Sequence, residues 1–213
     1  MILINNVTKK FGTNIILENI NLKLQEGNIY GFVGKNGSGK TILFKMIAGF
    51  MAPTNGEIKV YNKIIGKDVD FPTSCGIIIE SPGFINNLSG YKNLKLLSDI
   101  NKTISEDEIR KYMNFFGLDP YDKKKVKNYS LGMKQKLGLI QALMEDPKIL
   151  ILDEPMNALE EETVIKVREL LKKIKKEKII LLSSHNKEDI DLLCDRIYHV
   201  RDRHINICNE SAE

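Results

Sequence analysis

One glycine-rich stretch constrains this chain of 213 residues more than any other feature. Residues 34–41 read Gly-Lys-Asn-Gly-Ser-Gly-Lys-Thr and fit the pattern G-x-x-x-x-G-K-[ST]. The run at 29–33 before it is apolar, and residues 42–48 after it are apolar at helical spacing. A strand, a glycine-rich turn and a helix in this order direct backbone N–H groups and the positive end of the helix at one point. The sequence therefore predicts an α/β fold with a phosphate site.

The residue types in this stretch suit a nucleoside triphosphate. Its glycines allow left-handed dihedrals and a close approach between backbone and ligand. We expect Lys40 to reach the β- and γ-phosphates and the Thr41 hydroxyl to ligate Mg²⁺. The predicted nucleotide contacts in and next to the stretch are Gly34, Asn36, Gly37, Ser38, Gly39, Lys40, Thr41 and Ile42. The stretch does not identify the base of the nucleotide.

Composition narrows the class of protein. The chain is 42% hydrophobic and 28% charged, as soluble globular proteins are, and no apolar run approaches the ~18 residues of a membrane span. The N-terminus shows no signal-peptide pattern, so we expect a cytoplasmic protein that reaches a membrane only through a partner. The three cysteines lack C-x-x-C spacing and are expected to be free thiols. Basic clusters at 123–127 and 172–178 contain no aromatic residues, which favours solvated surfaces over nucleic-acid binding.

Apolar patterning predicts many strands and one block of helices. The predicted strands are 1–8, 16–24, 29–33, 57–61, 75–79, 149–152, 179–182, and two near 196–200 and 203–208. Thr54-Asn55-Gly56 is typical of a hairpin turn, and Phe11 is placed in a turn at 11–14. From about 88 to 145 the pattern is helical, with a capping box at Ser105 and Glu108 and a helix-ending glycine at 117. A further helix is predicted at about 160–176.

Polar residues follow two of the buried strands at the points where they end. Asp153 and Glu154 come after the strand at 149–152, and His185 follows the strand at 179–182. The carboxyl ends of parallel strands meet at one edge of a sheet, where ligands bind. We expect Asp153 to hold Mg²⁺ with Thr41, Glu154 to act as general base, and His185 to donate to the γ-phosphate. The alternative is that the acidic pair only caps a helix and the histidine is structural.

Taken together, these motifs resemble the ATP-binding subunit of ABC transporters, over nearly the whole chain. Residues 34–41 are similar to the Walker A motif of that family, residues 149–154 to its Walker B motif with the catalytic glutamate, and His185 to its switch histidine. The sequence Ser-Leu-Gly-Met-Lys-Gln at 130–135 resembles the family's signature, usually LSGGQ, which other NTPase families lack. Phe11 falls where the family places the aromatic residue that stacks on adenine.

The resemblance implies a fold, partners and cofactors. The implied fold is one ABC ATPase domain at 1–213, an α/β P-loop NTPase with a mainly parallel core sheet and an antiparallel β subdomain (1–83 and 146–213) and an inserted α-helical subdomain (about 84–145). Two ATPase subunits, as homodimer or heterodimer, are expected to hold ATP and Mg²⁺ between them, with Ser130 and Gly132 capping the γ-phosphate bound to the opposite subunit. A membrane-spanning subunit is expected to contact the loop after Glu80 and the helices near 84–100. That contact would hold the chain at the inner face of the cell membrane.

Three departures from the family pattern bear on function. The signature contains Met133 and Lys134, Glu80 stands where the family has Gln, and the segment 157–160 ends in Glu160 instead of Asp. Glu80 and the signature variant are similar to bacterial bacitracin-resistance and lantibiotic-immunity transporters, which implies export of, or immunity to, a peptide antibiotic or drug. Glu80 is a predicted metal ligand, although a carboxylate near the γ-phosphate would repel it.

Two other functions remain open from the sequence. A soluble ABC ATPase, in Fe–S assembly or another non-transport role, would have the same architecture. A GTPase is suggested by Asn186-Lys187-Glu188-Asp189, which fits the guanine-reading pattern N-K-x-D, but no D-x-x-G occurs in the chain.

Overall fold

The structure is a computed structural model and describes residues 1–80 and 83–208. These residues contain a six-stranded sheet of order β10-β9-β3-β8-β7-β6 and a four-stranded sheet of order β2-β1-β4-β5. The larger sheet is parallel except for β10, and the smaller one is antiparallel. The strands are β1 (Ile2–Phe11), β2 (Asn14–Leu24), β3 (Asn28–Val33), β4 (Asn55–Val60), β5 (Lys63–Ile64), β6 (Cys75–Ile78), β7 (Ile149–Asp153), β8 (Ile179–Ser183), β9 (Arg196–Arg201) and β10 (His204–Ile207).

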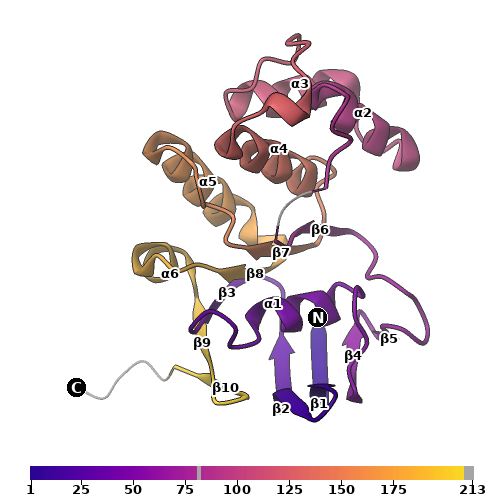
Figure 1. Cartoon of the computed structure of the whole chain (residues 1–213), viewed down its shortest axis with the longest axis vertical. Helices are drawn as coiled ribbons and strands as arrows, with labels where there is room; N and C mark the ends of the chain where they lie inside the picture. The colour runs from indigo at the N-terminus through magenta and orange to yellow at the C-terminus, as the bar shows by residue number, and fades with distance from the viewer. Residues whose placement is uncertain (81–82, 209–213) are drawn as a thin grey trace.

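The central strands β7 and β8 are buried along their whole length, as continuous apolar runs predict for a parallel sheet covered on both faces. Successive side chains of a strand point to opposite faces, and the core divides accordingly. Ile149 and Ile151 pack with α1 (Lys40–Ile47) and the smaller sheet, whereas Leu150 and Leu152 pack with the remaining long helices. Figure 1 shows α1 between the two sheets and α5 (Glu161–Ile174) above the larger one. The central strands are therefore covered on one face by α1 and the smaller sheet, and on the other face by the remaining long helices.

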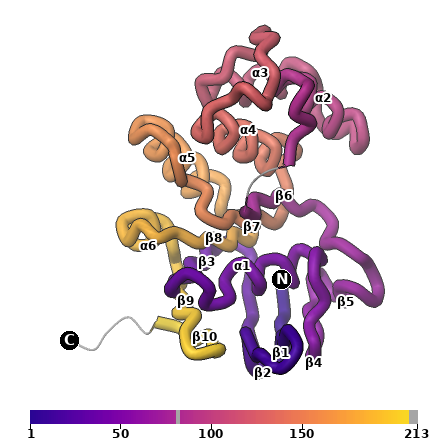
Figure 2. The backbone as a smooth tube through the Cα atoms, viewed as in Figure 1, coloured from indigo at the N-terminus to yellow at the C-terminus, as the bar shows by residue number. Residues whose placement is uncertain are grey.

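A block of helices lies between β6 and β7 in the chain. It contains α2 (Gly90–Asn101), α3 (Glu106–Phe115), the 3-10 turn η1 (Val126–Asn128) and α4 (Leu131–Leu143). Figure 2 shows the chain leaving the sheet after β6 and returning at β7, so that this block stands at one end of the molecule, opposite β1 and β2. The predicted capping box at the start of α3 is confirmed, and Gly117, with φ +71°, follows the end of that helix.

The backbones of α4 and β6 lie unusually close to each other. An added Cβ on Gly76 of β6 would lie 1.9 Å from the carbonyl oxygen of Ala142, near the end of α4. No residue larger than glycine fits at this position without moving the helix. The end of α4 therefore lies directly against β6.

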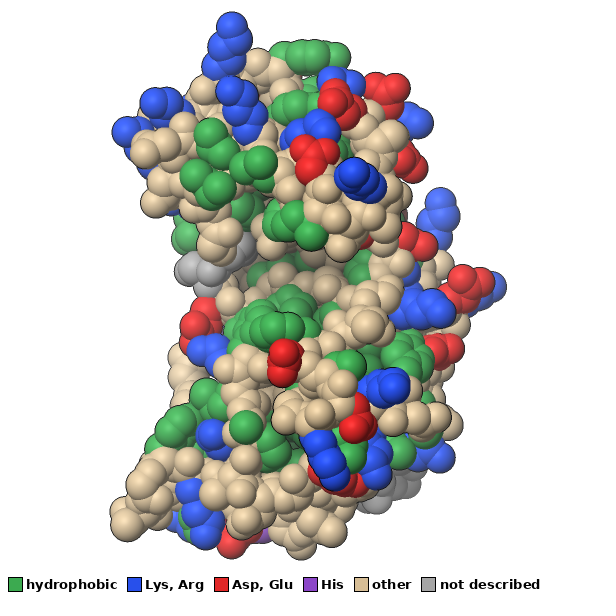
Figure 3. All heavy atoms as spheres, turned by 90° about the vertical axis from the view of Figure 1, so that its right-hand side faces the viewer, with side chains coloured by type: hydrophobic (Ala, Val, Ile, Leu, Met, Phe, Trp, Pro, Cys, Tyr) green, Lys and Arg blue, Asp and Glu red, His purple; other side chains and the backbone are tan. Residues whose placement is uncertain are grey.

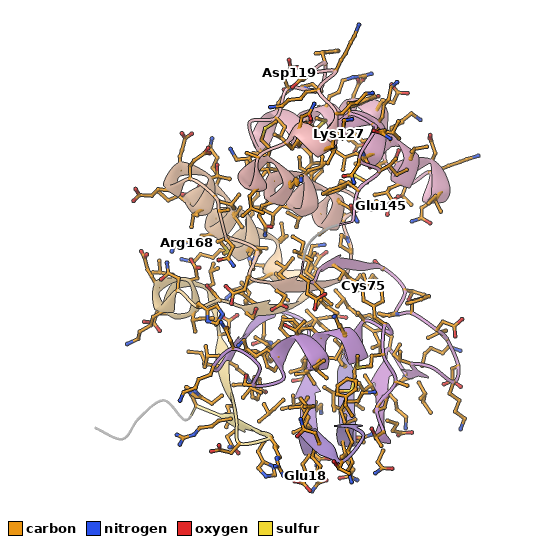
Figure 4. The ribbon with its side chains drawn as sticks, in the orientation of Figure 1. Glu18, Cys75, Asp119, Lys127, Glu145 and Arg168 are labelled. Atoms are coloured by element: carbon orange, nitrogen blue, oxygen red, sulfur yellow. The ribbon has the colours of Figure 1, made fainter. Side chains whose placement is uncertain are left out.

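A buried ion pair joins α5 to α6 (Lys187–Leu193), a helix that the sequence pattern did not predict. Arg168 of α5, labelled in Figure 4, donates through Nε and Nη2 to Oδ1 of Asp189 at 2.9 and 2.6 Å. The Ser184 hydroxyl donates to the other oxygen of this carboxylate at 2.7 Å. The Asp189 carboxylate is buried and hydrogen-bonded on both oxygens, and it therefore fixes the connection that carries His185. Lys175–Glu177 forms the 3-10 turn η2 between α5 and β8.

The predicted hairpin turn at 54–56 is wrong. Asn55 and Gly56 begin β4, which pairs with β1 from far away in the chain. Gly56 has φ +82°, and a Cβ there would lie 2.4 Å from the carbonyl oxygen of Asn6. The glycine therefore allows the irregular pairing of β4 with β1 between Asn5 and Thr8. The hairpin turn that follows β4 is formed by residues 61 and 62, both with positive φ.

Candidate active site

The glycine-rich loop joins β3 to α1, as predicted. Gly37 and Gly39 have φ of +77° and +110°, which residues with a side chain rarely adopt. Gly39 is the N-cap of α1 and supplies no side-chain acceptor to the first turn of the helix. The free N–H groups of that turn and the positive helix end form an anion site.

A cavity of about 330 Å³ opens at this loop. Most of the predicted site residues line it. The lining consists of Phe11, Ile16, Asn36, Gly37, Ser38, Gly39, Lys40, Thr41, Ile42, Asp153, Glu154 and His185. Gly34 lies behind this surface, where its carbonyl accepts a hydrogen bond from Lys40 Nζ at 2.7 Å. Phe11 ends β1 and pairs with Asn14 across the turn at 12–13, so the predicted turn at 11–14 is confirmed. Lys9 Nζ is 5.1 Å from the centre of the Phe11 ring.

Asp153 is the last residue of β7 and connects three elements. Its Oδ2 accepts a hydrogen bond from Thr41 Oγ1 at 2.7 Å, and its Oδ1 accepts one from the hydroxyl of Ser183 at the end of β8. The same hydroxyl accepts the N–H of Glu154 at 3.1 Å. Ser183 is fully buried and orients both acidic residues, a role that the sequence reasoning missed. A polar residue ending an apolar strand at the same edge was the signal for it.

Glu154 lies against His185. The backbone N–H of His185 donates to Glu154 Oε2 at 3.1 Å, and His185 Nε2 is 3.3 Å from Oε1. Burial raises the pKa of Glu154 above its ordinary value, and the hydrogen bond from His185 opposes the shift. A raised pKa makes this carboxylate a stronger proton acceptor, which suits a general base.

Lys40 is buried below the loop. Its ammonium group donates to the carbonyl oxygens of Gly34 and Lys35 at 2.7 and 3.2 Å. Burial lowers the pKa of Lys40, while the charges of Glu154 and Asp153 oppose the shift. The ammonium group therefore lies beneath the loop, near the carboxylates of Glu154 and Asp153.

The structure does not bring Glu80 into this cluster. Among the described residues that line the cavity, Glu80 is missing. Its Oε1 instead pairs with Lys45 Nζ, on α1, at 2.7 Å. A nearby cation thus holds the Glu80 carboxylate, and its grouping with Thr41 and Asp153 around a metal stays a prediction.

Ser130 and Gly132 lie on another surface, at the start of α4. Ser130 is the N-cap, and its hydroxyl accepts the N–H of Met133 at 3.1 Å. A Cβ on Gly132 would lie 2.6 Å from the carbonyl oxygen of Ala158, so the helix start packs against segment 157–160. Neither residue reaches the cavity of its own chain, since neither lines it.

Gln135 ties the signature to the acidic pair, and the sequence reasoning assigned it no such role. Its Nε2 donates to the carbonyl oxygens of Glu154 and Pro155 at 3.2 and 2.9 Å. One helical position further, Lys136 pairs with Glu160 at 2.7 Å. Both contacts join the first half of α4 to the segment between β7 and α5.

Two side chains of the N-K-x-D segment, Asn186 and Asp189, make structural hydrogen bonds within the fold. Asn186 is the N-cap of α6 and accepts the N–H of Glu188 at 2.9 Å. Asp189 is held by Arg168 and Ser184 and is 2% exposed. Its carboxylate is not available to read a guanine base, which argues against a GTPase.

Comparison with known proteins places this site in a family. The family profile described as ABC transporter matches residues 17–157, which include the loop, the signature and the acidic pair. The chain belongs to the ABC transporter family. Among solved structures of the family, a dimeric post-hydrolysis state of the ATP-binding cassette MJ0796 bound to ADP and Pi has the same fold. It superposes with a TM-score of 0.85 at 23% identity, over 99% of this chain and 100% of that one.

Sequence relatives in the ABC transporter family are transporter ATP-binding proteins. YybJ of Bacillus subtilis, an uncharacterised ABC transporter ATP-binding protein, is 42% identical over 92% of this chain and 90% of its own length. The lantibiotic transport ATP-binding protein SrtF of Streptococcus pyogenes is 37% identical over 92% and 85%. The bacitracin transport ATP-binding protein BcrA of Enterococcus faecalis is 36% identical over 94% and 66%. The chain spans only 64–66% of the length of BcrA and several other relatives.

Among the residues that the structure describes, no helix combines the length and the apolar character needed to cross a membrane.

Proposed function

We propose that this chain binds and hydrolyses ATP as the subunit that powers a bacterial ABC transporter for a peptide antibiotic or similar compound, in export or immunity. One observation carries the proposal: a single cavity combines the open end of α1, Lys40, the Thr41–Asp153 pair and Glu154. The names of BcrA and SrtF support a peptide antibiotic as cargo. They also favour transport over Fe–S assembly or another non-transport role.

The cavity suits ATP with Mg²⁺. Backbone N–H groups of the loop and Lys40 would hold the phosphates, and Phe11 would stack on the adenine at the far side of the cavity. The Thr41 hydroxyl and Asp153 are oxygen ligands of the kind that Mg²⁺ prefers. No cluster of three or more metal-binding side chains occurs in the described parts of the chain, which fits an ion that keeps water and phosphate ligands. When bound, Mg²⁺ supplies charge neutralisation at the phosphates.

Glu154 and His185 would carry the hydrolytic step. The raised pKa of Glu154, caused by burial, suits removal of a proton from an attacking water. His185 is half exposed, so its ring is accessible to a γ-phosphate in the cavity. Ser183 and Gln135 hold the backbone of Glu154 in place.

A second copy of the chain, or a related ATPase subunit, would complete the site. Ser130 and Gly132 lie at the exposed N-terminus of α4, where Leu131 is 68% exposed. This helix end is a second candidate anion site, and it does not line the glycine-loop cavity of its own chain. A head-to-tail dimer would place it over the γ-phosphate bound to the opposite glycine loop.

A groove on another face is our candidate for the membrane subunit. Its lining includes apolar residues from β6, α2, α4 and the segment after α1, and two of them, Phe50 and Ile100, are 56% and 75% exposed. Figure 3 shows hydrophobic side chains gathered in the hollow between the helical block and the sheets, and Figure 4 places Cys75 and Glu145 on opposite sides of it. An apolar hollow of this kind is typical of an interaction site. Docking there would hold the chain at the inner face of the membrane.

Replacing the proposed base tests the function. Glu154→Gln is expected to lower ATP turnover by at least about a hundredfold, because the amide cannot accept the proton. ATP binding is expected to persist, and light scattering should detect an ATP-dependent dimer that does not decay. Glu169→Gln, the same change at an exposed residue of α5, is the matched control. Normal turnover in Glu154→Gln would contradict the proposed role.

A further inference from the structure

The ion pair between Lys45 and Glu80 stands beside the proposed metal site. Lys45 follows Thr41 by one helical turn on α1, and its side chain is 24% exposed. Its ammonium nitrogen lies 2.7 Å from Glu80 Oε1, and the Glu80 side chain is 64% exposed. Both groups are therefore accessible to solvent and free to exchange partners.

The sheet register places Glu80 next to the acidic pair. Ile78 of β6 pairs with Leu152 of β7. Glu80 lies two residues beyond Ile78, and Glu154 lies two residues beyond Leu152, so both follow neighbouring parallel strands at the same edge. Neighbouring strands are about 4.8 Å apart, which brings a Glu80 side chain within reach of an ion bound to Asp153.

Charge explains why Glu80 needs a partner when metal is absent. Asp153 and Glu154 already bring two carboxylates to this edge, and a third next to triphosphate would be repelled. Lys45 neutralises Glu80, and Glu80 is not among the described residues that line the cavity. A divalent cation attracts a carboxylate more strongly than an ammonium group does at the same distance.

We propose that Lys45 is a positioning residue that competes with the nucleotide-bound Mg²⁺ for Glu80, so that Glu80 leaves Lys45 when Mg²⁺–ATP binds. This inference rests on the proposed function. It gives Lys45 a task outside phosphate binding, because Lys45 sets how readily Glu80 responds to the metal. It also reconciles the anionic residue at position 80 with a site for triphosphate.

The test is a double-mutant cycle on metal-dependent nucleotide binding. The probe is AMPPNP, which is not hydrolysed, titrated calorimetrically in Mg²⁺ and in EDTA. The readout is the ratio of the two dissociation constants. Lys45→Met is expected to raise the gain from Mg²⁺ about fivefold, the size expected for release of one partly exposed ion pair. Glu80→Gln is expected to reduce the gain, and Lys45→Met is expected to change nothing further when combined with Glu80→Gln.

Two control variants separate this effect from general loss of charge. Lys45→Arg keeps the pair and is expected to match the wild type. Lys95→Met removes a similar lysine–carboxylate pair on α2, away from the site, and is expected to leave the ratio unchanged. Equal effects of Lys45→Met with and without Glu80, or no effect of Glu80→Gln, would overturn the inference while leaving the ATPase proposal intact. Absence of AMPPNP binding in the wild type would overturn both.

Discussion

At the scale of single residues, the site depends on how Glu154 is held. The residue has φ +52°, a backbone conformation that favours glycine. Its N–H donates to both oxygen atoms of Ser183, its carbonyl accepts from Gln135, and its carboxylate faces His185. Every polar group of the backbone at this position is thus bonded to a residue from another element. The strained geometry is compensated by these contacts and aims the carboxylate into the cavity.

The raised pKa of Glu154 predicts that its ionisation lowers the free energy of unfolding, to an extent that depends on pH. Because burial raises its folded-state pKa above the ordinary value of 4.5, the folded chain binds this proton more tightly than the unfolded chain. The free energy of unfolding therefore falls as pH rises from below 4.5 through the folded pKa, and the cost persists at neutral pH. Glu154→Gln removes the titrating group and keeps an acceptor for His185. The variant is expected to be more stable than the wild type near neutral pH.

Urea unfolding of both proteins across a pH series measures this effect. The difference in unfolding free energy between Glu154→Gln and the wild type should shrink as the pH is lowered and disappear when the wild-type carboxyl is protonated. A difference that grows toward acid would mean that the folded state prefers the carboxylate, contrary to the assigned shift.

At the scale of elements, two glycines decide how closely α4 approaches its neighbours. Gly76 allows the backbone of α4 to contact β6, and Gly132 allows the start of α4 to contact segment 157–160. Together they fix α4 between the sheet and the end of β7. The signature is therefore rigidly placed relative to the acidic pair of its own chain.

Substitution of Gly76 tests this packing. Gly76→Ala places a methyl group against the Ala142 carbonyl and is expected to cost about 2 kcal/mol of unfolding free energy, because the helix backbone must shift. Gly83→Ala is the matched control, since its Cβ would meet nothing within 4 Å among the described residues. Denaturant unfolding of the two variants should separate them clearly. Equal stability of the two would refute the close contact.

Local motifs predicted the elements better than they predicted their partners. The continuous apolar runs at β7 and β8, the capping box of α3 and the glycine loop each depend on neighbours in sequence, and all are found. The hairpin turn predicted at 54–56 was wrong because Gly56 is required by its close contact with a distant strand, β1. No local sequence pattern reveals that contact. Ser183 and Gln135 were missed for the same reason, since their partners lie 30 and 19 or more residues away.

The surroundings of Glu80 could not be predicted from the family resemblance. Its position at the carboxyl edge of β6 follows from the sequence, but its partner, Lys45, is set by the side-chain positions of α1. Only the fold brings these two charges together. The metal role assigned to Glu80 therefore stays a prediction, now with a competing cation.

At the scale of the whole molecule, the two halves of the proposed site lie on separate surfaces of one chain. The cavity opens at α1 and the ends of β7 and β8, whereas the open N-terminus of α4 belongs to the helical block. Each half contains an anion site of the same kind, made by a helix end. A head-to-tail pair of chains brings unlike halves together, and the phosphate between them explains why closure would depend on ATP.

Cross-linking across this interface tests the central claim most directly. In a cysteine-free Glu154→Gln background, Asn36→Cys on the loop and Leu131→Cys on the signature helix provide two exposed thiols. With a short bis-maleimide and Mg²⁺–ATP, we expect a covalent dimer that neither single-cysteine variant forms, and that disappears without ATP or with Lys40→Ala. A dimer that forms equally without nucleotide, or no cross-link when ATP is bound, would contradict the account.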